Sequence, residues 1–229
     1  MPFDTLRSKA AEATAYARQA FLLARDLDAA LPEGVTAGDD VVFFLHGFLA
    51  TAGVLRPLRD HVARLGRVHA ASLTYPPGPG IAALSARLEA VLAPLRSDAR
   101  LHLVGHSLGG IVARHYAVTR RDERLVSTIA LASPFGGVKG AGLLPLSRDL
   151  APESAALALA RTAPCTVGAP HLSIFAGADG LTRDRVAHAP IGGEVVVVEG
   201  LGHNALLYDR AAMDLVVRRI LELRGTRVR

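Results

Sequence analysis

The amino-acid sequence predicts one α/β domain, with a mostly parallel central sheet of about six strands and helices on both faces. Six short apolar runs are spaced along its 229 residues, and amphipathic helical patterns lie between most of them. Continuously apolar strands that alternate with helices are typical of a parallel sheet covered on both sides. No internal repeat, low-complexity tract or linker divides the chain, so residues 1–229 are expected to form a single domain.

The first 34 residues predict a long amphipathic helix over 3–30. Apolar positions from Phe3 to Leu27 recur every three or four residues, and Pro32 and Gly34 end the pattern. The charges of this segment balance, whereas a helix on a membrane surface is usually basic on its polar face. We therefore expect the helix to pack on the domain, with contact to lipid or to a second copy as the alternative.

The remaining elements follow from the same patterns. Strands are predicted at 41–45, 67–73, 101–105, 125–133, 171–177 and 194–200, and helices at 54–65, 80–95, 108–120 and 205–224. The segment 135–170 interrupts the alternation because it is long for a connection and apolar for a loop. Insertions of this kind are commonly lids or binding loops, and a crossover helix with irregular ends is the alternative.

The net charge of +5 and the pI of about 10.0 raise the question of nucleic-acid binding. The basic residues are spread along the chain, however, and no helix-turn-helix, zinc or RNA-reading motif accompanies them, so no such partner is expected. No apolar run reaches the roughly 18 to 20 residues of a membrane helix, and no secretory signal is recognisable. Together with the single cysteine, Cys165, this predicts a cytoplasmic protein without a transmembrane segment.

The chemistry-bearing motif is Gly105-His106-Ser107-Leu108-Gly109, which follows an apolar strand and precedes a helical pattern. A serine at the centre of such a turn projects its hydroxyl above the edge of the sheet. Gly105 and Gly109 crowd against each other in this turn and leave no room for side chains. The motif therefore indicates a nucleophilic serine, Ser107.

A serine hydroxyl needs a base, and the base needs a group that orients it. His203 follows the last strand and precedes a long helix, which places it at the same edge of the sheet as Ser107. Asp179 follows the preceding strand in a glycine-flanked turn, and the chain order Ser-Asp-His is the one that suits this arrangement. Asp184 and Asp149 remain as alternatives for the acid.

Two backbone N–H groups are expected to bind the negative charge that develops on the substrate. Leu108 supplies one, at the start of the helix after the serine. Gly47 lets the chain turn after the first strand, so that the N–H of Phe48 faces the same place.

The motifs "LHGF", "GHSLGG", "ASP", "GADG" and "GLGHNALL" together resemble the α/β-hydrolase superfamily, and more narrowly the small bacterial lipases and esterases of the triacylglycerol-lipase type. The similarity runs from residue 41 to about 222. It implies hydrolysis of carboxylic esters through an acyl-enzyme, without an organic cofactor. By position, the family's nucleophile, acid, base and oxyanion donors fall on Ser107, Asp179, His203, Phe48 and Leu108. No acidic cluster indicates a calcium site, so no metal is predicted.

The substrate is expected to be a small-molecule or lipid ester whose acyl chain enters a narrow apolar pocket. Transfer of the acyl group to another acceptor, thioester cleavage, and a non-catalytic scaffold are the competing functions. The sequence leaves the oligomeric state open. The residues predicted to line the pocket are Leu49, Phe135, Leu143, Leu144 and Leu146.

Overall fold

The computed structural model describes residues 2–28, 31–143 and 145–224. A single sheet contains β1 (Asp40–Leu45), β2 (Val68–Leu73), β3 (Arg100–His106), β4 (Leu125–Leu131), β5 (His171–Ala176) and β6 (Glu194–Val198) in the order β2-β1-β3-β4-β5-β6. Every neighbouring pair is parallel. The α/β fold and the number of strands are therefore confirmed, and each strand lies within two residues of the range predicted for it.

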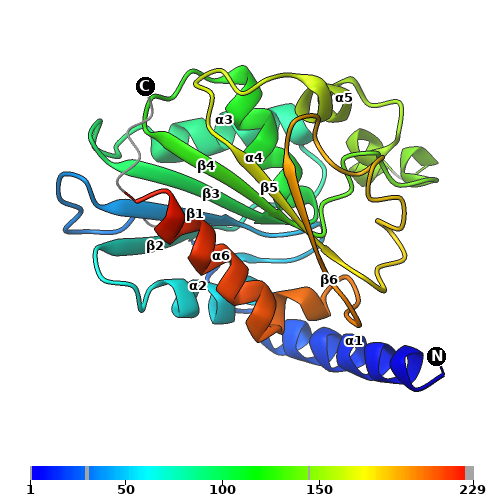
Figure 1. The fold of residues 1–229 in the computed structure, drawn as a ribbon. Coiled ribbons are helices and arrows are strands. Elements are labelled where there is room, and N and C mark those ends of the chain that lie inside the picture. The colour runs from blue at the N-terminus through cyan, green and yellow to red at the C-terminus, as the bar shows by residue number, and fades with distance from the viewer. Residues whose placement is uncertain (1, 29–30, 144, 225–229) are drawn as a thin grey trace.

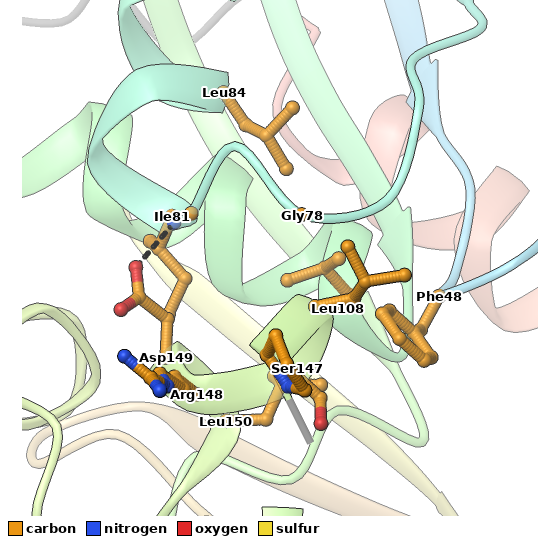
Figure 2. Close-up of a pocket in the computed structure, with 12 residues that line it drawn as sticks. Phe48, Gly78, Ile81, Leu84, Leu108, Ser147, Arg148, Asp149 and Leu150 are labelled. Atoms are coloured by element: carbon orange, nitrogen blue, oxygen red, sulfur yellow. Dashed lines mark hydrogen bonds between the residues drawn. The ribbon is translucent and has the colours of Figure 1, made fainter. Parts of the chain in front are cut away.

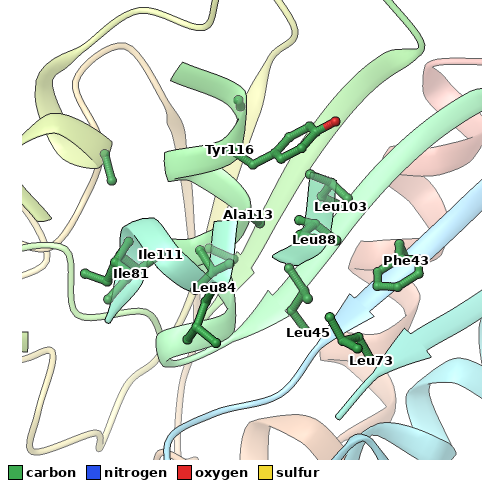
Figure 3. Packing of buried hydrophobic residues seen from close by; sticks show 14 of the residues in the cluster. Phe43, Leu45, Leu73, Ile81, Leu84, Leu88, Leu103, Ile111, Ala113 and Tyr116 are labelled. Atoms are coloured by element: carbon green, nitrogen blue, oxygen red, sulfur yellow. The ribbon is translucent and has the colours of Figure 1, made fainter. Parts of the chain in front are cut away.

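Helices cover both faces of this sheet (Figure 1). One face carries α3 (Ile81–Leu92), α4 (Leu108–Thr119) and α5 (Ala155–Thr162), and the other carries α2 (Arg56–Val62) and α6 (Arg210–Glu222). Strand β1 shows why its sequence is continuously apolar. Phe43 and Leu45 face the first layer, shown in Figure 3, while Val42 and Phe44 face the second. All four side chains are fully buried.

The N-terminal helix α1 (Pro2–Leu22) is shorter than predicted. After it the chain turns at Asp26, whose φ is +52° and whose carboxylate accepts hydrogen bonds from both Arg56 and Arg59. These contacts come from a segment about 30 residues away, so helical periodicity alone could not locate the end of the helix. None of the helices in the described ranges combines the length and the hydrophobicity of a membrane-spanning segment.

Two other predicted helices are divided. The range 205–224 contains η4 (Ala205–Tyr208), a 3-10 helix, and then α6, which begins where the Asp209 carboxylate accepts a hydrogen bond from the N–H of Ala212. The range 54–65 includes the end of η1 (Ala52–Leu55) and the whole of α2. The insertion 135–170 has two parts in the structure. Its first part holds η2 (Ala141–Leu143) and η3 (Pro145–Leu150), and its second part holds α5, the helix of the β4-to-β5 crossover.

Candidate active site

Ser107 occupies a strained turn between β3 and α4. Its backbone has φ +53° and ψ −119°, a conformation that residues with a side chain rarely adopt. The Ser107 N–H donates to the Leu131 carbonyl at 2.9 Å, which ties the turn to the end of β4. Strain of this kind gathers at functional sites, and here it falls on the residue that the sequence motif predicts as the nucleophile.

The glycines on either side of Ser107 supply space. A Cβ on Gly105 would lie 2.2 Å from the carbonyl carbon of Gly109, and a Cβ on Gly109 would lie 2.1 Å from the carbonyl oxygen of Leu45. Both contacts are with backbone, which cannot move aside without displacing a strand or a helix. Gly110, which the motif analysis did not single out, is equally tight, because its Cβ would lie 2.1 Å from the Ser133 hydroxyl.

Asp179 and His203 are in direct contact at the carboxyl edge of the sheet. The Nδ1 of His203 lies 2.8 Å from the Oδ2 of Asp179, across 24 residues of chain. The Asp179 side chain is fully buried, whereas 14% of the His203 side chain is exposed. Burial raises the pKa of Asp179, but hydrogen bonding to His203 and its neighbours outweighs burial and leaves that pKa below its ordinary value. The ionised carboxylate therefore holds a proton on Nδ1 of His203 and leaves Nε2 as the basic nitrogen.

Two further groups hold the Asp179 carboxylate. The Thr182 hydroxyl donates to Oδ2 and the Leu181 N–H donates to Oδ1, each at 2.8 Å. Sequence reasoning missed Thr182, although a hydroxyl three residues after an aspartate in a turn is a recognisable signal. The alternative acids lie elsewhere. Asp184 is exposed and its carboxylate accepts from the N–H of Ala187, while Asp149 accepts from the N–H of Ile81.

The base and the serine turn are joined through the backbone. The Nε2 of His106, the residue before Ser107, donates to the carbonyl of His203 at 3.1 Å, and the two imidazole rings lie 4.8 Å apart. Within the described ranges, the Nε2 of His203 has no hydrogen-bond partner, the Ser107 hydroxyl included. Such bonds are often long in substrate-free enzymes and shorten in the reacting complex.

His106 and His46 serve as fixed, uncharged supports. Burial lowers the pKa of His106 to about 3 and that of His46 to about 4. The Nδ1 of His46 donates to the carbonyl of Gly47 at 2.8 Å, its Nε2 accepts from the N–H of Tyr75, and the two rings stack. The contacts of the His46 side chain therefore fix the turn that leads to Phe48.

The proposed oxyanion donors, Phe48 and Leu108, flank the serine. A Cβ on Gly47 would lie 3.2 Å from the Cβ of Ser107, so the turn before Phe48 passes directly beside the nucleophile. Leu108 is the first residue of α4 and has no acceptor in the preceding turn. In the described part of the chain, the backbone N–H groups of both residues have no acceptor. Two unpaired donors next to a serine hydroxyl form a suitable place for a developing oxyanion.

A cavity opens beside Phe48 and Leu108 (Figure 2). Phe48 and Leu108 line one side of it, and Ile81 and Leu84 at the start of α3 line another. The segment 145–150, which contains η3, completes the wall. This part of the predicted insertion therefore shares a cavity with Phe48 and Leu108, while its role as a lid or binding loop stays a prediction.

The five predicted pocket residues have different positions. Leu146 lines the cavity, and its side chain reaches Gly78, where a Cβ would lie 2.7 Å from Leu146 Cδ2. Leu49 and Leu143 do not line this cavity, and their exposed fractions are 64% and 87%. The prediction for Phe135 is corrected, because this side chain is buried in the core and packs edge-on against His171. Leu144 lies outside the described residues.

The described residues contain no group of three or more His, Cys, Asp or Glu side chains arranged to hold a metal ion.

The sequence matches no protein-family model and no curated protein. Solved structures with a similar fold include a metagenome-derived lipolytic enzyme of the LipS and LipT study, which is 18% identical, has a TM-score of 0.64, and aligns over 86% of this chain and 100% of its own. Est1E from Butyrivibrio proteoclasticus is 16% identical with a TM-score of 0.64 over 86% and 93% of the two chains. An esterase/lipase from an uncultured bacterium is 15% identical with a TM-score of 0.60 over 93% and 90%. The chain has the α/β-hydrolase fold, and its structural neighbours include esterases and lipases.

Proposed function

We propose that the protein is a serine hydrolase that cleaves carboxylic esters through an acyl-enzyme. Ser107 is the nucleophile, His203 the general base and acid, and Asp179 the group that orients His203. The observation that carries the proposal is the 2.8 Å contact between Asp179 and His203, whose backbone is hydrogen-bonded to the residue before the strained Ser107. A buried carboxylate, an imidazole with a free Nε2 and a serine in such a turn form the working unit of this reaction.

In the first half-reaction, the Nε2 of His203 takes the hydroxyl proton as Ser107 Oγ attacks the ester carbonyl carbon. The carbonyl oxygen becomes negative and accepts hydrogen bonds from the N–H groups of Phe48 and Leu108. The C–O bond to the alcohol then breaks, and His203 returns the proton to the leaving oxygen. The products are a free alcohol and an ester of Ser107.

In the second half-reaction, water takes the place of the alcohol. His203 accepts a proton from water as its oxygen attacks the acyl-serine, and the same two amides bind the oxyanion. The tetrahedral intermediate then breaks its bond to Ser107 Oγ, and His203 returns the proton to that oxygen. This step releases the carboxylic acid and restores the Ser107 hydroxyl. The cavity between Phe48, Leu108 and the 145–150 segment is proposed to hold the acyl chain, because both residues that carry the proposed oxyanion donors line it and most of its lining side chains are apolar.

The test is hydrolysis of p-nitrophenyl acetate, butyrate, octanoate and palmitate by the purified protein. We expect turnover by the wild type and by Ser97→Ala, which removes an exposed serine that precedes β3, whereas Ser107 follows that strand. Ser107→Ala is expected to lose about 10⁴-fold or more in kcat. Equal rates for Ser107→Ala and the wild type would refute the assignment. Added alcohols separate hydrolysis from acyl transfer, since a transferase would form a new ester as its main product.

The natural substrate is proposed to be a small or lipid ester, and a cytoplasmic location remains a prediction for cell fractionation to check.

A further inference from the structure

The segment that carries His203 is held by the N-terminal helix. Helix α1 lies against η4, the 3-10 helix that follows His203 (Figure 1). Glu12 contributes to this contact, and its carboxylate reaches across 192 residues of chain to the backbone of Asn204. One N-terminal side chain is therefore bound to the residue next to the proposed catalytic base.

The Glu12 carboxylate accepts hydrogen bonds from three donors. Its Oε1 lies 3.0 Å from the Asn204 N–H nitrogen and 2.8 Å from the Asn204 side-chain nitrogen, and its Oε2 lies 3.0 Å from the Ala205 N–H nitrogen. The Asn204 side-chain oxygen in turn accepts from Gln19, also on α1, at 2.8 Å. Asn204 is 7% exposed, so its groups have little water to replace these partners.

The chain is shaped to admit this carboxylate. A Cβ on Gly202 would lie 2.4 Å from the Oε2 of Glu12. The residue before His203 therefore leaves room for Glu12, and the residue after it is bound by Glu12. His203 is fixed from three directions: its Nδ1 by Asp179, its carbonyl by His106, and the following peptide by Glu12.

We propose that Glu12 is a positioning residue for catalysis, and that α1 is a working part of the active site. Its carboxylate fixes the peptide plane after His203 and thereby the direction of the imidazole toward Ser107. This inference rests on the proposed function. It predicts that Glu12 acts on the rate through His203 without touching the substrate, since it lines neither the cavity nor the oxyanion site.

Glu12→Gln keeps the size of the side chain but presents an amide where three N–H donors now meet a carboxylate. We expect kcat for p-nitrophenyl butyrate to fall about 10- to 100-fold, because small displacements of a catalytic group have effects of this size. KM should stay within about twofold of the wild type. Glu33→Gln, a change at an exposed glutamate after α1, is the matched control and should leave both constants unchanged.

A double-mutant cycle separates positioning from a general effect on the fold. In a His203→Ala background, Glu12→Gln should change the residual rate by less than twofold, because the group that it positions is gone. An equal loss of rate in both backgrounds, or a folded Glu12→Gln protein with wild-type kcat, would overturn the inference. If Glu12→Gln does not fold, Gly202→Ala displaces the same carboxylate and must give the same loss of kcat at constant KM.

The position of His203 can also be followed without substrate. In protein labelled with ¹³C at histidine Cε1, the His203 signal is identified by its loss in His203→Ala. We expect Glu12→Gln to shift or broaden this signal and to leave that of His61 unchanged. An unmoved His203 signal would overturn the inference even in an active enzyme. An inactive wild type whose Ser107 resists acylation would instead refute the proposed function, so the two failures are distinguishable.

Discussion

The Asp149 carboxylate accepts a hydrogen bond from the N–H of Ile81 at 2.8 Å, joining the segment over the cavity to the first turn of α3. Gly80, which precedes α3, has no side chain to cap this helix, and a Cβ there would lie 2.6 Å from Oδ2 of Asp149. The insertion therefore supplies the cap that the helix lacks, and the same bond closes one wall of the cavity.

Replacing Asp149 with alanine should lower the free energy of unfolding by about 1 kcal/mol, the usual value for a lost helix cap. The KM for p-nitrophenyl butyrate should also rise, because the 145–150 segment loses its attachment to α3. Urea unfolding and steady-state kinetics measure the two effects. Glu153→Ala, at an exposed acid of the same insertion, serves as the control. Identical unfolding curves for Asp149→Ala and Glu153→Ala would contradict this account.

Leu146 should set the length of acyl chain that the cavity accepts. Truncation to alanine opens the wall next to Gly78, so the ratio of kcat/KM for octanoate to that for acetate should rise by about tenfold. The control is Leu143→Ala, since Leu143 is 87% exposed and does not line the cavity. If both variants keep the wild-type ratio across the ester series, the acyl chain binds elsewhere.

Gly109→Ala should be severely destabilising. The new methyl group would meet the backbone of β1 at 2.1 Å, and we expect the loss of stability to reach about 3 kcal/mol, the upper end of the usual cost of overpacking, because backbone cannot move aside. Gly66→Ala is the matched substitution, because within the described part of the chain a Cβ at Gly66 would have nothing within 4 Å, and it should change stability by less than about 0.5 kcal/mol. Thermal unfolding compares the two. A soluble Gly109→Ala protein with wild-type stability would show that the turn is not packed as described.

Stability should fall as the solution becomes acidic, through buried histidines. Burial lowers the pKa of His171 from 6.5 to about 3, and its two nitrogens lie 2.7 Å and 3.0 Å from the hydroxyls of Thr128 and Ser173. Between pH 6.5 and about pH 3, the unfolded chain binds a proton at His171 and the folded protein does not. Unfolding then takes up a proton, and the free energy of unfolding decreases by up to about 1.4 kcal/mol per pH unit for each such group.

His171→Asn removes the imidazole that binds this proton in the unfolded chain, and it leaves the carboxylates and the other histidines in place. Urea unfolding at pH 7.0, 6.0 and 5.0 should give a less stable variant whose stability depends less steeply on pH, by roughly one proton. The two slopes are compared directly, so contributions common to both proteins cancel. Parallel curves for the variant and the wild type would contradict the lowered pKa.

Much of the fold can be predicted from the sequence because buried parallel strands leave a strong local pattern. Strand β1 is apolar at every position from Val41 to Leu45, since both of its faces are covered. The turn around Ser107 is equally readable, because its geometry requires small residues at fixed offsets. Asp179 and His203 could be selected because the carboxyl ends of parallel strands meet at one edge.

The features that could not be predicted depend on contacts between distant segments. The end of α1 is set by salt bridges from Asp26 to α2, and the role of Glu12 depends on a peptide 192 residues away. Phe135 illustrates a different difficulty. An aromatic residue at the start of an apolar insertion could line a substrate pocket or belong to the core, and the sequence does not distinguish the two. In the structure, Phe135 packs against His171 in the core.

Covalent labelling shows whether Ser107 is the nucleophile. Intact-mass spectrometry after treatment with a fluorophosphonate should show a single adduct on the wild type and on Ser97→Ala, and no adduct on Ser107→Ala. His203→Ala, which lacks the proposed base, should react far more slowly than the wild type. Equal labelling of Ser107→Ala and the wild type, or a wild type that takes up no label, would contradict a nucleophilic Ser107.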